Sequence, residues 1–199
     1  MKKKIKVAVT GSIGSGKSEF CRIAEKFGFV VLRSDEISKE LLASNQSVKK
    51  RVIKAFGSQS YKDDKPDFKF LAEIVFNDIV KLRQLESILH PIVINKIQKL
   101  SDQILLKHNI VFIESALIYE ADIEKFFDYV VLITAPREVR LQRKLQSGLT
   151  EQDFIKREEN QIPDDEKKKR ADFIFINDKS LAELEQYFKI LCLTLNIPV

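Results

Sequence analysis

The stretch from Val7 to Ser18 carries the residue types that hold the phosphates of a nucleotide. Residues 11–18 fit the pattern G-x-x-x-x-G-K-[ST] at every position. In this pattern the glycines let backbone N–H groups turn inward around phosphate oxygens, the lysine reaches the terminal phosphates, and the hydroxyl can hold Mg²⁺. We therefore predict a phosphate-binding loop in which Lys17 and Ser18 perform the last two tasks.

The residues around this loop fit the elements that it requires. The apolar run Val7–Val9 precedes it, which is typical of a buried strand. Beyond it, apolar residues recur at the spacing of one buried helix face, namely Phe20, Ile23, Ala24 and Phe27. Such a helix completes the anion site with its N-terminal amides and dipole. The alternative, a chance glycine-rich turn before a helix, does not account for this agreement.

Two acidic residues follow other apolar runs. Asp35 could accept a proton from an acceptor hydroxyl and orient it for in-line attack, or it could cap the helix 36–42. Glu114 stands where an acid would help hold Mg²⁺, directly or through water, or it is a solvated glutamate at the end of a strand. The residues alone leave both pairs of roles open.

A basic helix is predicted after the fourth strand, and it contains Arg140 and Arg143. Charge accumulates on a phosphoryl group during its transfer, and a guanidinium can spread across two of its oxygens. The two arginines are therefore candidates for a lid over the nucleotide, with an exposed basic helix face as the alternative. His90 is a lone histidine among helical apolar residues, and a histidine in such a place is more often structural than catalytic.

Five short apolar runs predict the strands of an α/β fold. Their β-branched and aromatic content, without clean alternation, is typical of a parallel sheet covered by helices on both faces. The runs are Ile5–Thr10, Phe29–Leu32, Ile110–Ile113, Tyr129–Thr134 and Phe173–Ile176. The residues expected side by side are Val7 and Val9 with Val111 and Ile113. The chain of 199 residues, 44% hydrophobic and 32% charged, is predicted to be one globular domain with insertions.

Two long gaps between the predicted strands indicate these insertions. A crossover between parallel strands needs little more than about a dozen residues, yet residues 35–108 hold several helical patterns. We interpret this segment as a helical substrate-binding insertion whose last helix breaks or restarts at Pro91. We interpret residues 136–170 as a lid, which leaves a core of 1–34, 109–135 and 171–199. Capping-box spacing predicts two further helix starts, at Thr150 with Asp153 and at Ser180 with Glu183.

With these residues in view, the sequence resembles the dephospho-coenzyme A kinase family almost from end to end. The resemblance rests on the phosphate loop and on motifs in a fixed order, which are Ser34-Asp35, Phe56-Gly57, Leu71–Phe76, Leu89–Ile92, Leu117–Glu120, Arg143, Gln161, Ala171-Asp172 and Asn177. It implies a P-loop NTPase fold with a five-stranded parallel sheet, a helical substrate-binding insertion and a lid. It also implies ATP as the phosphoryl donor, Mg²⁺, and dephospho-CoA as the substrate.

The resemblance implies roles for individual residues as well. Asp35 matches the proposed catalytic base toward the ribose 3′-hydroxyl, Arg143 matches a lid arginine, and Asn177 lies in a segment similar to the adenine-side loop. The positions that match the family's ATP loop are Gly14, Ser15, Gly16, Lys17, Ser18 and Glu19. The candidate substrate-binding residues are His90, Glu114 and Leu117.

The chain also departs from the family pattern. Arg33 stands where the first acid of Asp-Ala-Asp is usual, and Phe68, followed by Lys69, stands where an arginine is common. Ala116 begins the segment that usually reads Pro-Leu-Leu, and Gln146 replaces a second lid arginine. These departures concern substrate and lid contacts more than the class of reaction.

The predicted function is therefore ATP-dependent phosphorylation of the 3′-hydroxyl of dephospho-CoA, the last step of coenzyme A synthesis. The alternative within the same class is another small-molecule P-loop kinase, with a nucleoside, nucleotide or sugar acceptor. Outside the class it is a regulatory nucleotide switch or a nucleic-acid-dependent ATPase. The sequence holds no Asn-Lys-x-Asp motif, no Asp-x-x-Gly loop, and no basic stripe with interleaved aromatics. A polyanionic substrate explains the formal net charge of +5.

No stretch of the sequence indicates a membrane span or a secretory signal. The charged start Met1–Lys4 is followed by an apolar run too short for a signal peptide, and Tyr129–Ile133 is too short to cross a bilayer. We expect a cytoplasmic enzyme without nucleic acid, membrane or obligate protein partners. Cys21 and Cys192 are expected to be reduced core residues.

Overall fold

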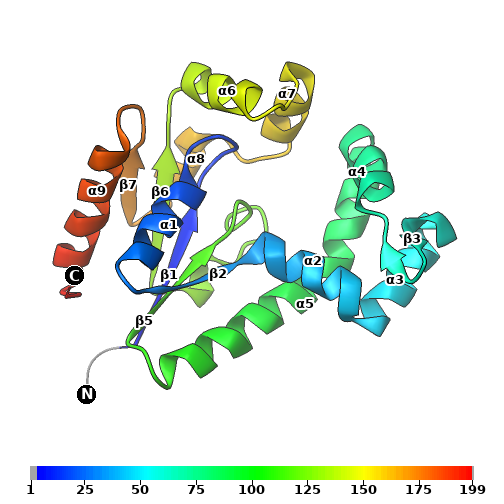
Figure 1. The fold of residues 1–199 in the computed structure, drawn as a ribbon, viewed down its shortest axis with the longest axis horizontal. Helices are drawn as coiled ribbons and strands as arrows, with labels where there is room; N and C mark the ends of the chain where they lie inside the picture. Colours follow the sequence, from blue (N-terminus) through cyan, green and yellow to red (C-terminus); the bar gives the residue numbers. More distant parts are fainter. Residues whose placement is uncertain (1–3, 199) are drawn as a thin grey trace. The chain divides into compact units, whose positions relative to one another are not determined.

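The computed structural model describes residues 4–198, so the charged start at Met1–Lys3 lies outside the described residues. The chain divides into two compact units, drawn in Figure 1. The first contains the residues up to Arg33 and from Ser101 onward, and the second is Ser34–Leu100. Within residues 4–198, no helix combines the length and the apolar character that crossing a membrane needs.

A five-stranded parallel sheet forms the centre of the first unit (Figure 1). Its strands, in spatial order, are β2 (Val30–Arg33), β5 (Ile110–Glu114), β1 (Ile5–Thr10), β6 (Tyr129–Thr134) and β7 (Phe173–Ile176). The predicted α/β class is confirmed, and all five predicted runs form strands. They differ from the prediction at their ends, because β2 runs from Val30 to Arg33 and β5 includes Glu114.

The register of β1 and β5 differs by one residue from the prediction. The two strands are neighbours, as expected, but Val7 lies opposite Phe112 instead of Val111. Successive side chains point to opposite faces of a sheet, so this register puts Val7 and Phe112 on the same face. That face is buried against α1 (Lys17–Lys26) and α9 (Leu181–Thr194), and this shared apolar face decides the register.

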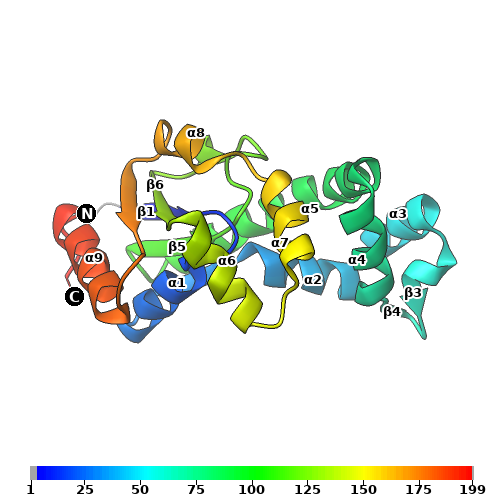
Figure 2. The same cartoon turned by 90° about the horizontal axis from the view of Figure 1, so that it is seen from above.

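Helices cover both faces of the sheet, as predicted. Figure 2 shows α1 and α9 on one side and α8 (Asp164–Lys168) on the other. On α9, the ring of Phe188 meets other rings at centroid distances of 5.4 to 5.8 Å, those of Phe20, Phe27, Phe29 and Phe112. This aromatic cluster holds α1 on the sheet, and with it the loop that precedes α1. Cys21 and Cys192 are buried free thiols in the same core, as predicted, and burial raises the pKa of Cys192 to about 12.

The remaining helices of the first unit follow β5 and β6. They are η2 (Glu124–Phe126), α6 (Arg137–Gln146), α7 (Glu151–Glu159) and α8. The hydroxyl of Thr150 accepts a hydrogen bond from the backbone N–H of Asp153 and caps α7. Ser180 caps α9 in the same way through Glu183. Both caps confirm the helix starts that the spacing predicts.

The second unit is helical and contains one small hairpin. Its elements are α2 (Ser34–Ser44), α3 (Gln46–Phe56), η1 (Ser58–Ser60), β3 (Tyr61–Lys62), β4 (Lys65–Pro66), α4 (Phe68–Asn77) and most of α5 (Ile79–Leu105). Gly57 ends α3 with a φ of 88°, a left-handed conformation that glycine adopts without strain. Asp63 and Asp64 have φ of 48° and 66°, as in the type I′ turn that closes a two-residue hairpin.

Pro91 does not break the last helix of this unit, so that prediction is wrong. Helix α5 runs through it from Ile79 to Leu105. A proline inside a helix removes the backbone hydrogen bond to the carbonyl four residues earlier, here that of Ser87. Pro91 and Ser87 are both exposed, whereas Ile88 and Leu89 are buried. The lost bond therefore lies on the solvent side, and the buried apolar side keeps the helix continuous.

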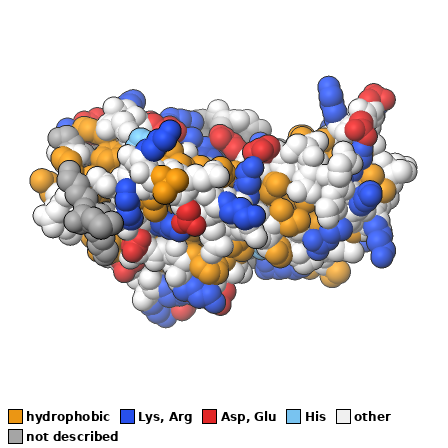
Figure 3. Space-filling view, turned by 90° about the horizontal axis from the view of Figure 1, so that it is seen from below, with side chains coloured by type: hydrophobic (Ala, Val, Ile, Leu, Met, Phe, Trp, Pro, Cys, Tyr) orange, Lys and Arg blue, Asp and Glu red, His pale blue; other side chains and the backbone are white. Residues whose placement is uncertain are grey.

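Charged side chains of both signs occur on the molecular surface. On the face drawn in Figure 3, lysine and arginine side chains form small groups separated by hydrophobic and neutral surface. This face carries no continuous basic stripe, which agrees with the scattered basic residues of the sequence.

Candidate active site

The loop of residues 11–16 joins β1 to α1 and is packed closely against its surroundings. Gly16 precedes α1 with a φ of 98°. A Cβ on Gly16 would overlap the side-chain amide of Asn177, and a Cβ on Gly14 would overlap the backbone carbonyl of Arg140. Both glycines are therefore needed for the close fit of the loop as well as for its turn.

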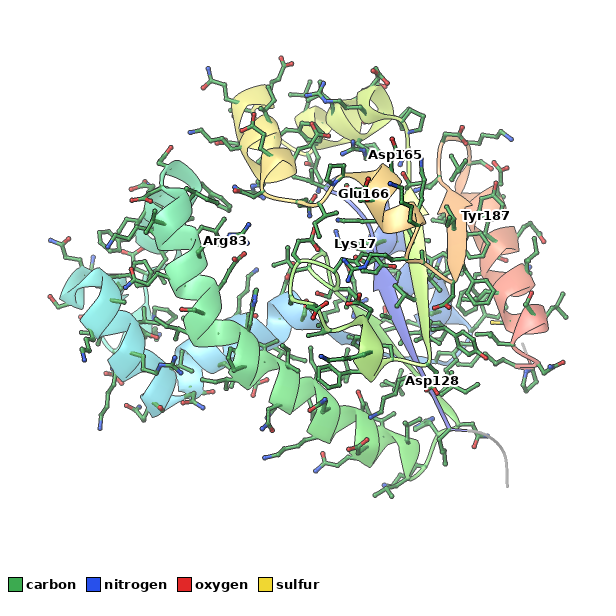
Figure 4. All side chains as sticks on the ribbon, turned by 180° about the vertical axis from the view of Figure 1, so that it is seen from behind. Lys17, Arg83, Asp128, Asp165, Glu166 and Tyr187 are labelled. Carbon is green, nitrogen blue, oxygen red and sulfur yellow. The ribbon has the colours of Figure 1, made fainter. Side chains whose placement is uncertain are left out.

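Lys17 and Ser18 begin α1 directly after this loop. Figure 4 shows Lys17 at the carboxyl end of β1. The N-terminal amides of α1 and the helix dipole make this position favourable for an anion. Glu19, in the same first turn, forms an ion pair with Arg22 at 2.6 Å. Its carboxylate is thus engaged at the surface of α1.

Asn177 supports the loop from the end of β7. Its side-chain Nδ2 donates to the carbonyl of Ser15 at 2.9 Å, and its backbone N–H donates to the carbonyl of Thr134 at 2.7 Å. Asn177 is only 8% exposed, and Ser15 is fully buried. The side-chain amide of Asn177 therefore stabilises the conformation of the loop. A role beside the adenine stays a prediction.

Ser18 and Glu114 form a hydroxyl–carboxylate pair between α1 and the end of β5. Ser18 Oγ donates a hydrogen bond to Glu114 Oε1, and Glu114 is only 8% exposed. The other carboxylate oxygen, Oε2, is buried and has no hydrogen-bond partner among residues 4–198. Oε2 forms an ion pair with Arg33 at 3.3 Å, and because it accepts no hydrogen bond it can still take a ligand.

Arg33 lies between this pair and a second carboxylate. It makes a bidentate pair with Glu25 at 2.7 and 2.8 Å, and the hydrogen bond from Arg33 lowers the pKa of Glu25 from its ordinary value. Its Nε lies 3.3 Å from Glu114 Oε2. The arginine that replaces the usual family acid thus brings a positive charge next to Glu114.

The Ser18–Glu114 pair fits Mg²⁺. This ion prefers oxygen ligands and usually takes one or two protein ligands together with substrate phosphates and waters. A serine hydroxyl and a buried carboxylate oxygen without a hydrogen bond are such ligands. In the part of the chain that the structure describes, no group of three or more His, Cys, Asp or Glu side chains could hold a metal. A site completed by the phosphates of a nucleotide suits this chain better than an all-protein cage.

Arg140 reaches the loop from α6 and is almost completely engaged. It is 8% exposed, its Nε donates to the carbonyl of Ala135 at 3.1 Å, and its Nη1 donates to that of Ile13 at 3.3 Å. Its Nη2 forms an ion pair with Glu158 at 2.7 Å. The alternative of an exposed basic face is therefore wrong for Arg140. All three of its guanidinium nitrogens have partners within the protein.

Arg143 lies one helical turn further along α6 and is less constrained. It is half-buried, and among the described residues it makes one hydrogen bond, from Nη1 to the carbonyl of Gly14 at 3.4 Å. A bond of this length is weak. The guanidinium of Arg143 therefore lies beside the loop without being held there as Arg140 is.

Asp35 and His90 belong to the second unit. Asp35 is exposed in the first turn of α2, which begins at Ser34, so an N-cap at Asp35 is wrong. The helix starts earlier than that alternative assumed because β2 passes directly into it. His90 is half-buried on α5, and burial lowers its pKa, an effect that Glu86 opposes.

The remaining predicted contact, Leu117, is half-buried after β5, and its backbone N–H donates to Ser115 Oγ at 3.3 Å. Phe68 is 45% exposed at the start of α4, and Gln146 is exposed at the end of α6. Nothing in the structure explains the departures at Phe68, Ala116 and Gln146.

Two residues without a predicted role contact the loop directly. Gln161 Oε1 accepts the backbone N–H of Ile13 at 2.8 Å, and Asp164 accepts hydrogen bonds from Ser12 Oγ and Thr134 Oγ1. Gln161 belongs to a family motif, so the sequence singled it out, but the motif did not indicate that it binds the loop. No local pattern marks Asp164, because Ser12 lies 152 positions away in the sequence.

The sheet order and the loop that joins its central strand to α1 define the class of P-loop kinases. A shikimate kinase from Acinetobacter baumannii shares this fold with a TM-score of 0.57 at 21% sequence identity. The match covers 98% of this chain and 95% of that one. The predicted P-loop fold is therefore confirmed.

The family is shown by closer relatives. The family model for dephospho-CoA kinase matches residues 5–183. The dephospho-CoA kinase of Protochlamydia amoebophila is 37% identical over 96% of this chain and 97% of that protein. A solved dephospho-CoA kinase from Campylobacter jejuni is 30% identical, with a TM-score of 0.65 over 96% of this chain and 97% of that one. The structure of TT1252 from Thermus thermophilus, also 30% identical, has a TM-score of 0.80 over 98% and 99%.

The chain belongs to the dephospho-CoA kinase family. Its activity is that of a dephospho-CoA kinase, which uses ATP and catalyses the last step of coenzyme A biosynthesis. The family, the enzyme class and the function predicted from the sequence are confirmed.

Proposed function

We propose that the chain transfers the γ-phosphoryl group of ATP to the ribose 3′-hydroxyl of dephospho-CoA, with Mg²⁺ held by the Ser18–Glu114 pair. The observation that carries this proposal is that pair, in which a hydroxyl and a buried carboxylate lie where the loop passes into α1. Mg²⁺ held by these two side chains would neutralise charge on the nucleotide phosphates.

The side chains around the loop stabilise the charge that develops during transfer. Lys17 binds the terminal phosphates, and the loop amides surround them. Arg143 spreads its guanidinium over phosphoryl oxygens, which its one long hydrogen bond leaves it able to do. Arg140 has a different task from the one predicted for it. From α6, its guanidinium donates a hydrogen bond to the carbonyl of Ile13 and pairs with Glu158, so Arg140 is a positioning residue for the loop.

Asp35 takes the proton of the 3′-hydroxyl. It lies two residues after Arg33, the last residue of β2, and its carboxylate is exposed. No hydrogen bond or ion pair within residues 4–198 occupies that carboxylate, so it is available to a hydroxyl. His90 and Leu117 are candidate contacts for the rest of the substrate.

The same proposal assigns functions to the larger segments. Residues 35–108 bind dephospho-CoA, and residues 136–170 act as the lid over the nucleotide. Arg140 and Arg143 fit the second assignment because both contact loop carbonyls from within that segment. A cytoplasmic location and the absence of nucleic-acid, membrane and obligate protein partners stay predictions.

The first experiment compares kcat/KM for dephospho-CoA, adenosine and AMP at the same ATP and Mg²⁺ concentrations. We expect dephospho-CoA to be preferred by about 100-fold or more, because binding energy from its remote pantetheine arm can orient the reacting hydroxyl. The position of the new phosphate is read by ³¹P NMR. A preference for either small acceptor, or a phosphate elsewhere on the ribose, would contradict the proposal and favour another small-molecule kinase.

The second experiment tests the metal ligands. Glu114→Gln removes a carboxylate charge, and we expect the Mg²⁺ concentration at half-maximal activity to rise about tenfold or more. The matched control is Glu185→Gln on α9, where the carboxylate pairs with Lys189 at the surface. An unchanged Mg²⁺ requirement in the Glu114 variant would remove Glu114 from the metal site.

A further inference from the structure

The short segment of residues 161–167, here called the strap, follows α7 and is hydrogen-bonded to the loop. Gln161 Oε1 accepts the backbone N–H of Ile13 at 2.8 Å. Asp164 Oδ1 accepts a hydrogen bond from Ser12 Oγ. Side chains of the strap therefore accept hydrogen bonds from one backbone N–H and one hydroxyl in the first half of the loop.

The strap is also fastened on its other sides. The second carboxylate oxygen of Asp164 accepts a hydrogen bond from Thr134 Oγ1 at the end of β6. Lys167 Nζ lies 3.0 Å from Glu120 Oε1, and these side chains are only 0% and 4% exposed. The same Glu120 oxygen accepts the backbone N–H of Ile162 at 2.9 Å. A buried ion pair thus anchors the strap to the segment that follows β5, and Asp164 joins the strap to the loop.

We propose that Asp164 is a positioning residue for the ATP site, with the Glu120–Lys167 pair as its anchor. Asp164 holds Ser12 and the first half of the loop in the shape that receives phosphates. This inference rests on the proposed function, in which the loop binds the phosphates of ATP.

The energetics of the strap favour a role in geometry over one in stability. A buried ion pair contributes little net stability, because the desolvation of two charges opposes their attraction. Its value lies in holding Lys167 and Glu120 in one arrangement. The Asp164 carboxylate accepts one hydroxyl hydrogen bond with each oxygen, and these two bonds fix its orientation. A displacement of Asp164 therefore displaces Ser12 as well.

The central test replaces Asp164 by Asn, which keeps the size of the side chain but leaves only one accepting oxygen. We expect the Kd of a fluorescent ATP analogue to rise about tenfold, equivalent to about 1.4 kcal/mol. The matched control is Asp165→Asn, in the next residue, whose exposed carboxylate pairs with Lys168 at the surface. It should leave the Kd unchanged. A Kd for Asp164→Asn within about twofold of the unaltered chain would overturn the proposal.

A double-mutant cycle distinguishes positioning from a general loss of structure. Ser12→Ala and Asp164→Ala should each weaken binding of the same analogue, and the double variant should lose less than the sum of the two, because both changes remove the Ser12–Asp164 hydrogen bond. Additive losses would overturn the link between the two residues. Lys17→Ala separates this inference from the proposed function. If Lys17→Ala binds the analogue normally, the loop is not the ATP site, whereas if it alone loses affinity, only the positioning role fails.

The anchor is tested by removing one charge and then both. Glu120→Gln leaves Lys167 buried without a charged partner, so its thermal midpoint should fall. The double variant Glu120→Gln with Lys167→Met has no buried charge and should recover the midpoint, while its affinity for the ATP analogue stays reduced. Recovery of both the midpoint and the affinity would overturn the role of the anchor.

Discussion

Arg140 and Arg143 both lie on α6. We expect the removal of Arg140 to lower the stability of the chain and the removal of Arg143 to lower its turnover. Arg140→Ala removes one of the two arginine partners of Glu158, which is 24% exposed, and two hydrogen bonds to backbone carbonyls. Breaking a fully buried ion pair costs about 3–5 kcal/mol. Partial exposure of Glu158 and its remaining pair with Arg137 reduce this cost, and the lost hydrogen bonds add about 1 kcal/mol. A total of about 3 kcal/mol follows.

This loss corresponds to a large shift in melting temperature. A chain of 199 residues loses about 2–4 °C per kcal/mol, so Arg140→Ala should melt about 6–12 °C lower. Arg143→Ala removes only a contact of 3.4 Å, so its melting temperature should stay within about 2 °C. Its turnover should instead fall by about 100-fold or more, and ATP binding by much less, because the guanidinium acts on charge that develops during transfer.

The assay combines thermal unfolding, direct ATP binding and single-turnover rates on both variants. Arg137→Ala is the matched control, since Arg137 contacts the same Glu158 at 2.8 Å but is about half exposed, so its loss should cost under about 1 kcal/mol. Arg140→Ala with normal melting and lost turnover would refute the positioning role and restore the catalytic role predicted from the sequence. Full activity in Arg143→Ala and in the double variant would reduce both arginines to structural residues.

Three further substitutions test the remaining parts of the site. Lys17→Ala should lower phosphoryl transfer by about 100-fold or more without unfolding the chain, and normal turnover would contradict the phosphate-loop assignment. Asp35→Asn should leave ATP affinity within about a fewfold and cut turnover by about 100-fold, with no change in melting temperature; a mutant with full turnover would exclude Asp35 as the base. Arg33→Gln should tighten Mn²⁺ binding in the presence of a non-hydrolysable ATP analogue, by about threefold or more, because it removes a positive charge beside Glu114. Electron paramagnetic resonance measures this affinity directly, and weaker binding would show that Arg33 orients Glu114 instead of competing with the metal.

Features that depend on neighbours in the sequence were predictable. The loop 11–18 and the caps at Thr150 and Ser180 each depend on a few consecutive residues and on local backbone geometry. The strands followed from apolar runs of the right length, because a strand buried on both faces has few polar positions. The family followed from motifs in order along the chain, each of which is also local.

Some local signals were overruled by packing. Pro91 predicts a helix break, but its solvent-facing position on α5 makes the lost hydrogen bond tolerable. The pairing of Val7 with Phe112 depends on which faces of β1 and β5 share the core, and no periodicity within either strand contains that information.

The sequence by itself determined that this chain carries a phosphate-binding loop, an α/β sheet and the motifs of its family. Only the tertiary structure decided what the side chains around the loop do. It engaged Arg140 with Glu158 and with the carbonyl of Ile13, and it brought Asp164 to Ser12 across 152 positions of sequence. The physical reason is that hydrogen bonds and ion pairs act over a few ångströms in space. Their partners are therefore set by how strands and helices pack, whereas a sequence pattern reports only residues that are close along the chain.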